Sequence, residues 1–115
     1  MDCKEAFNKS SEVMFPKNID NIAKFIDNAI EKGEFCCKFA VPSWIPNNAS
    51  DNDKVILILK FMKIHGYTGF TGSYNSYPSG SITIYWKLEA EELLKKFDEM
   101  SQKFDEMLEE KNATK

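Results

Sequence analysis

The chain has 115 residues, of which 43 % are hydrophobic, so it can form one compact domain whose core needs no disulfide or metal to hold it together. All 15 basic residues are lysines, and 18 acidic residues outweigh them to give a formal net charge of −3. Arginine usually reads phosphates and guanine edges, so its absence and the acidic balance argue against nucleic acid as a partner.

The first part of the chain is expected to hold two separate helical segments. Residues 1–17 form a partly ordered N-terminal segment, with a short helix from Lys4 to Met14 that Pro16 ends, because proline removes a helical hydrogen bond. Asn18 then offers a capping side chain to an amphipathic helix that Gly33 stops. The apolar face of this second helix consists of Ile19, Ile22, Ala23, Ile26, Ala29 and Ile30. The α+β domain is predicted to cover residues 18–87.

A strand follows from Glu34, where the apolar period changes from helical to alternating. One face of the strand carries Phe35, Cys37, Phe39 and Val41, and the other carries Cys36, Lys38 and Ala40. This alternation predicts a strand with one buried face. The next connection is irregular because Pro42 and Pro46 bracket it, and we expect Trp44 and Ile45 to pin it.

A strongly apolar helix is predicted between Ser50 and His65. Ser50 and Asp53 form a helix-start pattern, and Gly66 supplies the left-handed conformation that ends the helix. Apolar residues lie nearly all round its axis: Val55, Ile56, Leu57, Ile58, Leu59, Phe61, Met62 and Ile64. Such a helix is expected to be covered on more than one side.

Two strands joined by a polar turn are predicted next. Residues 67–74 form a strand that Gly69 and Gly72 weaken, and residues 75–80 form the turn before an alternating strand. The predicted fold class is therefore α+β: a small three-stranded, mainly antiparallel sheet with two helices on one face, plus a C-terminal coiled-coil helix. The core should unite the helix from Val55 to Ile64 with Phe35, Cys37, Phe39, Ile82, Ile84 and Trp86.

Residues 88–115 are predicted to form a separate C-terminal helix with a heptad repeat. Two consecutive blocks, 96–102 and 103–109, both begin Lys-Phe-Asp-Glu-Met. Steps of three and four residues place five oligomerisation candidates on one stripe of the helix: Leu93, Phe97, Met100, Phe104 and Met107. Leu94 and Leu108 lie beside this stripe and widen it. A helix this acidic is marginal alone in water, so it should pack on its own domain or on copies of itself. The repeat and its charged flanks favour self-association.

No catalytic or metal-binding set is expected. Cys36 and Cys37 are neighbours in a strand, so their side chains project to opposite faces and cannot chelate one ion together. His65 is the single histidine and stands before a helix-ending glycine, where a capping role is favoured over that of a general base. We therefore expect a protein that is not an enzyme and that uses no cofactor and no metal.

The sequence also bears on the compartment. Its three cysteines, which include Cys3, lack the even spacing of a disulfide framework, so reduced thiols in the cytoplasm are expected. The first residues lack the apolar run of a signal peptide, and no stretch reaches the roughly 20 apolar residues that span a bilayer. No membrane partner is expected.

The polar turn and the strand ends beside it form a candidate ligand-binding site. Its glycines, hydroxyls and tyrosines suit a phosphate or a stacked base, and the candidate residues are Tyr74, Tyr77, Ser79, Ser81, Tyr85 and Lys87. The stretch lacks the residue order of a phosphate-binding P-loop, and a plain solubilising turn is the favoured alternative.

Residues 19–87 resemble a loose group of small phage and large-virus proteins. The resemblance is carried by Ile26-Asp-Asn-Ala-Ile-Glu-Lys-Gly-Glu-Phe-Cys36, by His65-Gly-Tyr67 after an apolar helix, and by Ser81-Ile-Thr-Ile-Tyr-Trp86. Two departures are Tyr85, where a small serine is usual, and the C-terminal heptads. The resemblance implies a viral source and an accessory or virion-associated role without catalytic residues.

Three functional hypotheses follow. The first is a non-enzymatic viral accessory protein of the host cytoplasm, a homo-oligomer that binds a host protein or a small signalling nucleotide, for instance to counteract host defence. The second is a structural component of the virion. The third, an enzyme, is disfavoured because the sequence shows no paired nucleophile and base.

Overall fold

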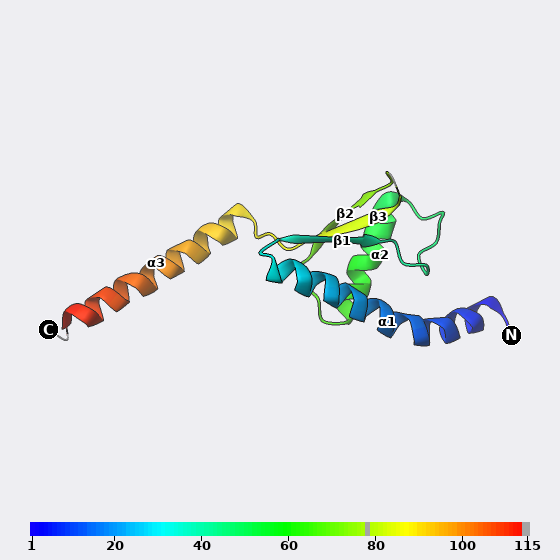
Figure 1. Cartoon of the computed structure of the whole chain (residues 1–115), viewed down its shortest axis with the longest axis horizontal. Coiled ribbons are helices and arrows are strands. Elements are labelled where there is room, and N and C mark those ends of the chain that lie inside the picture. Colours follow the sequence, from blue (N-terminus) through cyan, green and yellow to red (C-terminus); the bar gives the residue numbers. More distant parts are fainter. Residues whose placement is uncertain (78, 114–115) are drawn as a thin grey trace.

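The computed structural model describes residues 1–77 and 79–113 (Figure 1). In chain order its elements are α1 (Cys3–Glu31), β1 (Cys36–Ala40), α2 (Asp51–Ile64), β2 (Thr71–Asn75), β3 (Ser81–Tyr85) and α3 (Ala90–Ala113). The strands form one antiparallel sheet, and α3 is a long C-terminal helix, so the predicted α+β class is confirmed.

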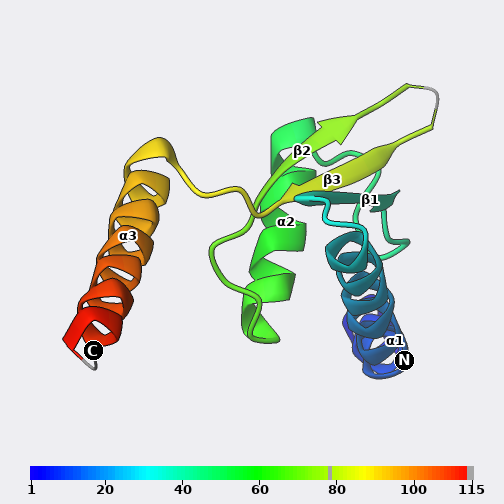
Figure 2. The same ribbon diagram turned by 60° about the vertical axis from the view of Figure 1, so that its left-hand side comes forward.

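The sheet has the order β1-β3-β2, which places the last strand of the sequence in the middle. Ile84 of β3 lies opposite Cys37 on one side and opposite Gly72 on the other. Opposed residues of antiparallel strands point to the same face, and this face receives both α1 and α2 (Figure 2). The predicted placement of two helices on one face is confirmed.

The core lies between this sheet face and the two helices. At its centre Ile58 and Met62 of α2 meet Ile82 and Ile84 of β3, and all four side chains are 0 % exposed. The other two elements complete the core with Ile22, Ile26 and Ala29 of α1 and Cys37 and Phe39 of β1. The predicted meeting of α2 with the alternating strands is therefore confirmed.

Phe35 departs from the predicted core. It lies one residue before β1, in the connection that follows the left-handed Gly33, and it is 58 % exposed. Its carbonyl oxygen still accepts a hydrogen bond from the backbone N–H of Trp86 (3.0 Å), which extends the ladder by one bond. Trp86 itself packs against the core and is partly buried.

α1 is one helix of 29 residues, so the prediction that Pro16 ends a first helix is wrong. Proline removes one backbone donor, but its fixed φ is helical, and packing beside it offsets the loss. The ring of Phe15 lies 5.3 Å from that of Trp44 and 5.2 Å from that of Phe61, measured between centroids. Contacts with distant parts of the chain thus stabilise a helix that continues without a break at residue 16.

Asn18 does not cap a helix, contrary to the prediction, because it lies inside α1. Its Nδ2 donates a hydrogen bond to the Met14 carbonyl oxygen (3.0 Å), and its Oδ1 accepts one from Trp44 Nε1 (3.3 Å). Asp2 caps the helix instead, by accepting a hydrogen bond from the backbone N–H of Glu5 (2.9 Å). Asn18 therefore ties α1 to the connection after β1.

α2 begins and ends as predicted. Ser50 Oγ accepts a hydrogen bond from the backbone N–H of Asp53 (3.1 Å), and Gly66 has a φ of +91° after the last turn. The expectation that α2 is covered on more than one side is confirmed for two sides, because β2 packs on one and Phe15 of α1 packs on Phe61 at another, but no described element packs on the remaining side. The outer face of α2 consequently leaves Ile56 38 % and Ile64 80 % exposed.

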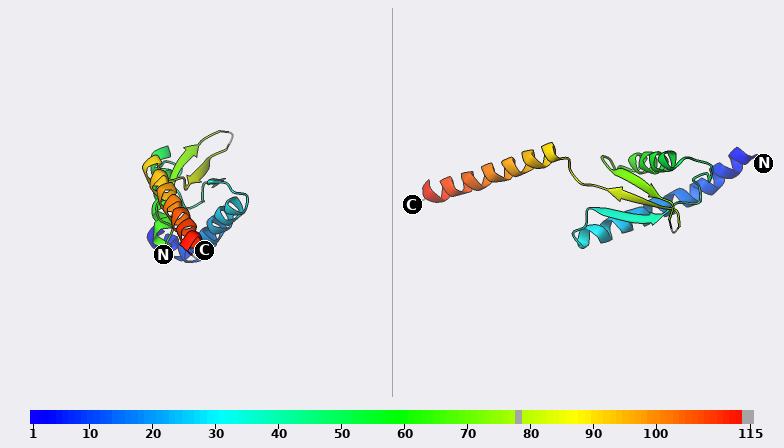
Figure 3. Two further views of the ribbon diagram at one scale, coloured as in Figure 1. Left: turned by 90° about the vertical axis from the view of Figure 1, so that its left-hand side faces the viewer. Right: turned by 90° about the horizontal axis from the view of Figure 1, so that it is seen from above.

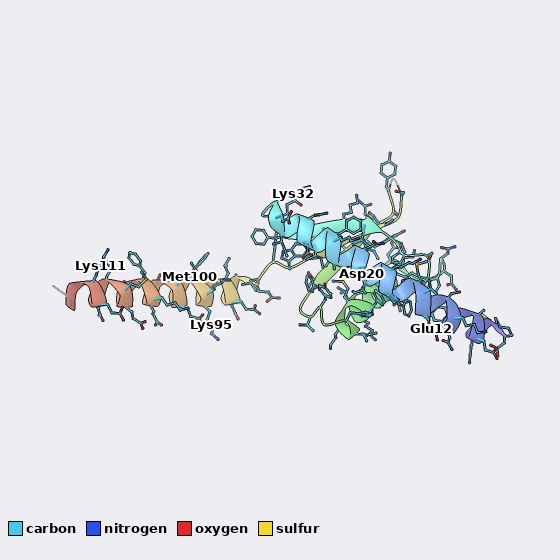
Figure 4. The ribbon with its side chains drawn as sticks, turned by 60° about the horizontal axis from the view of Figure 1, so that its bottom comes forward. Glu12, Asp20, Lys32, Lys95, Met100 and Lys111 are labelled. Carbon is cyan, nitrogen blue, oxygen red and sulfur yellow. The ribbon has the colours of Figure 1, made fainter. Side chains whose placement is uncertain are left out.

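α3 stands apart from the rest of the fold (Figures 1 and 3). All of its described side chains are exposed. The Cα radius of gyration is 20.4 Å, against about 13 Å for a compact domain of this length, and the principal extents are 77 × 29 × 23 Å. Figure 4 shows Lys95, Met100 and Lys111 spaced along this free-standing helix.

Candidate functional site

The five oligomerisation candidates form one exposed stripe on α3. Steps of three and four residues bring them to one face of the helix, and their exposed fractions run from 39 % for Leu93 to 66 % for Met107. We call this set the α3 seam: Leu93, Phe97, Met100, Phe104 and Met107. Leu94 and Leu108 adjoin it on one side and are 64 % and 45 % exposed. The structure confirms the helix and leaves the self-association of the seam a prediction.

Charged residues occupy most of the other described positions of α3. Lys96 and Lys103 directly precede the two phenylalanines of the seam, on the side opposite Leu94 and Leu108. Acidic residues fill the positions farther from the seam: Glu91, Glu92, Asp98, Glu99, Asp105 and Glu106. The helix therefore has one apolar face, one lysine-edged flank and an acidic back, which is typical of a helix that packs along one side.

The six candidate ligand-binding residues are divided between the two faces of the sheet. Tyr74 points to the helix face, where Lys54 Nζ lies 4.6 Å from its ring centroid. Tyr85 lies on the opposite face, with its hydroxyl 3.3 Å from Ser73 Oγ. Ser81 shares the face of Tyr85, but it lies four steps earlier along the strand, about 13 Å away. The structure therefore does not gather these residues around one point.

The remaining candidates lie in exposed positions. Tyr77 is 80 % exposed in the connection between β2 and β3, and Ser79 is exposed in the same connection. Lys87 is exposed beyond the end of β3 and lines a shallow groove with Phe70 and Trp86. The Ser81 hydroxyl is buried and has no hydrogen-bond partner among the described residues.

The adjacent cysteines face opposite ways, as predicted. Cys37 is buried in the core, whereas Cys36 is half-buried on the other face of β1. Desolvation, with a smaller contribution from the Cys36 thiol, raises the pKa of Cys37 from 9.0 to about 11. The Cys37 thiol therefore stays protonated near neutral pH, where it is a poor nucleophile and a poor metal ligand.

His65 packs on its own helix. Its ring lies 4.9 Å from the ring of Phe61, centroid to centroid, and the residue occupies the C-cap position of α2, where the prediction placed it. Among the described residues, no three of His, Cys, Asp and Glu are grouped closely enough to hold a metal ion.

Sequence reasoning missed an aromatic cluster that joins α1 to α2. Phe7, Phe15, Trp44 and Phe61 follow one another in edge-on or tilted contacts, with centroids 5.0–6.1 Å apart. A groove of about 560 Å³ lies beside it, lined by Cys3, Phe7, Met14 and Trp44 among others. The signal was present in the spacing of Phe7, Met14 and Phe15, which is helical and continues beyond Pro16 with Ile19 and Ile22.

No protein-family model, curated protein or solved structure matches this chain. In the part of the chain that the structure describes, no helix has the length and apolarity needed to cross a membrane. The geometry of the chain itself is therefore the basis for a functional proposal, and the α3 seam is its most distinctive feature.

Proposed function

We propose that this chain is a non-enzymatic accessory protein of a phage or large virus, which assembles with copies of itself through α3 and presents its α+β domain to a host protein in the host cytoplasm. The exposure of the α3 seam is the observation that supports this assembly. The viral source and the host partner draw on the resemblance of residues 19–87, because no described feature of the fold points to a partner of its own.

The seam supports association through its area. A side chain of the size of phenylalanine that is about half exposed presents roughly 100 Å² to water, so the seam with Leu94 and Leu108 presents about 700 Å². Contiguous apolar patches beyond a few hundred Å² on soluble proteins usually mark an interaction site. An isolated helix is also marginal in water, so packing the seam would stabilise α3 itself.

The non-enzymatic part of the proposal draws on the state of the reactive side chains. Burial keeps the Cys37 thiol protonated, and the His65 ring rests against Phe61 rather than beside a hydroxyl or thiol nucleophile. These placements favour packing and capping roles over proton transfer.

The assembly is tested by comparing Phe104→Asp with Gln102→Asp in the full chain. Both changes add one negative charge to the middle of α3, but Phe104 lies in the seam and Gln102 on the opposite face. Each buried phenylalanine contributes about 2 kcal/mol, and a pair of copies buries two, so Phe104→Asp should weaken association about a thousandfold.

Native mass spectrometry and light scattering at matched concentrations would read the result. The wild type and Gln102→Asp should be oligomeric where Phe104→Asp is monomeric. A wild-type chain that stays monomeric at high micromolar concentration, or equal masses for the two variants, would refute assembly through the seam.

A further inference from the structure

We infer that two copies of α3 pair side by side in antiparallel orientation, with the midpoint of the pair at the height of residue 102 along the helix. This inference rests on the proposed self-association and assigns its geometry. Four contact layers of phenylalanine and methionine then join one copy to the other: Phe97 to Met107, Met100 to Phe104, and the two symmetry-related layers. At each end of the pair, Leu93 of one copy lies toward Lys111 of the other. Two observations on α3 favour this arrangement over a parallel one, and a third supports its register.

The first observation is the order of large residues along the seam. In a parallel pair each residue meets its own copy, so Phe97 would meet Phe97 and Met100 would meet Met100, and wide layers would alternate with narrower ones. In the antiparallel register every one of the four layers joins one phenylalanine to one methionine. The layers then have equal volume, and each thioether lies beside an aromatic ring, which is a favourable contact.

The second observation is the position of the two flanking leucines. Leu94 and Leu108 directly follow Leu93 and Met107, so they occupy the same heptad position on one side of the seam. A parallel pair would place Leu94 against Glu89 and Leu108 against Lys103 of the second copy. The antiparallel register places Leu94 against Leu108 on that side, which buries both apolar side chains against each other.

The charged flank has little influence on the choice. The antiparallel register brings Lys96 of each copy toward Glu110 of the other and the two copies of Lys103 toward each other, which makes two approaches of opposite sign and one of like sign. Exposed pairs of this kind contribute little, because water and salt screen them.

The third observation is the extent of the helix. α3 runs from Ala90 to Ala113, so its midpoint coincides with the proposed centre, and the two helices overlap along almost their whole length. The area of about 700 Å² per helix is close to the roughly 800 Å² that each partner contributes to a standard interface. Because α3 extends away from the sheet (Figures 1 and 3), the second helix has room to lie along it, and the two α+β domains lie at opposite ends.

Spin labels on the back of α3 test the orientation in the full chain. Lys95→Cys, Gln102→Cys and Glu109→Cys place one label each on the face opposite the seam, in a background with Cys3→Ser and Cys36→Ser. Pulsed dipolar spectroscopy then measures the distance between the labels of two copies. The background protein without a new cysteine should take up no label, because the remaining thiol, Cys37, is buried.

The antiparallel pair predicts a pattern of three distances. The two labels at position 102 lie at the same height along the pair, whereas the labels at position 95 and those at position 109 are offset by about 21 Å along the axis. The distance should therefore be shortest at 102 and equally longer at 95 and 109.

Each other outcome overturns a defined part of the reasoning. Three equal distances would establish a parallel pair and refute the orientation while keeping the proposed assembly. A minimum at 95 or 109 would refute the register. No dipolar signal from a monomeric chain would refute the assembly itself. An oligomer without close labels would show that the copies associate through a surface other than paired α3 helices, and would also refute the pair.

Discussion

Gly72 lets α2 lie unusually close to the sheet. A Cβ atom added to Gly72 would come within 3.0 Å of Val55 Cγ1 and within 3.3 Å of both Ile84 Cδ1 and the Thr83 carbonyl oxygen. Carbon atoms in good contact are about 3.5–4.0 Å apart. The terminal methyl of Ile84 can rotate away. The Thr83 carbonyl group belongs to the sheet ladder, and Val55 Cγ1 is attached directly to the Cβ atom of a helical residue, so neither can move far without a shift of the backbone.

We therefore predict that Gly72→Ala destabilises the fold. Alanine in a strand gains roughly 0.5–1 kcal/mol over glycine from the smaller entropy loss, while overpacking costs about 1–3 kcal/mol. The net loss should be about 1 kcal/mol, or a fall in Tm of roughly 4–8 °C. Urea unfolding followed by tryptophan fluorescence would show it as a lower midpoint with an unchanged m-value.

Val55→Ala provides the matched control for this prediction. It removes the closest methyl group and should cost about 2 kcal/mol alone, because it deletes two buried carbons. In the double variant the 3.0 Å contact with Val55 is absent and only the two 3.3 Å contacts remain, so the combined loss should fall short of the sum by about 1 kcal/mol. A stabilised Gly72→Ala protein, or strictly additive losses, would show that α2 does not approach the sheet in this way.

Two further predictions concern Cys37 and Pro16. Because the fold raises the pKa of Cys37 from 9.0 to about 11, its contribution to stability should be complete below pH 9 and lost as the pH rises to about 11, by an amount on the order of 2 kcal/mol. Urea midpoints at pH 8 and pH 11 should therefore fall less for Cys37→Ala than for the wild type, and an equal fall would contradict the burial. Pro16→Ala should raise stability by at least about 1 kcal/mol and slow amide exchange in residues 3–15, because it restores a backbone donor in an exposed stretch of α1; unchanged exchange would show that this part of the helix frays.

Local patterns predicted much of this fold. Ser50 and Gly66 mark the ends of α2 through chemistry that involves only neighbouring residues, and the alternation of Cys37 with Phe39 identifies the buried face of β1. Side-chain period and capping are local properties, so the sequence reveals them without knowledge of the packing.

The errors in prediction have a common physical origin. Pro16 has an unfavourable local effect that packing of Phe15 on Trp44 and Phe61 overcomes, and these partners lie far along the chain. The apolar outer face of α2 likewise looks like a buried surface until the arrangement of α1 is known. Propensity and pattern give way where contacts between distant segments decide the outcome.

The candidate sites show the same difference between local patterns, which the sequence reveals, and contacts between distant segments, which it does not. The spacing of Phe97 and Phe104 predicts the seam on one face, whereas its exposure depends on whether the domain offers α3 a complementary surface. The separation of Tyr74 from Tyr85 depends on how β2 and β3 pair, because a shift of one residue in the pairing would move a side chain to the other face.

The central place of β3 also sets the order in which this domain can be made. On a ribosome, β1 emerges long before β3, its partner in the sheet. The edge of β1 that carries Cys37 and Phe39 therefore stays unpaired until the chain has been synthesised through residue 85. Pairing Ala40 with Ser81 then closes a loop of about 40 residues, at an entropic cost of about 3 kcal/mol. The nascent chain therefore passes through a stage that exposes an apolar edge, the form in which small β-containing proteins are most prone to aggregate or to engage a chaperone.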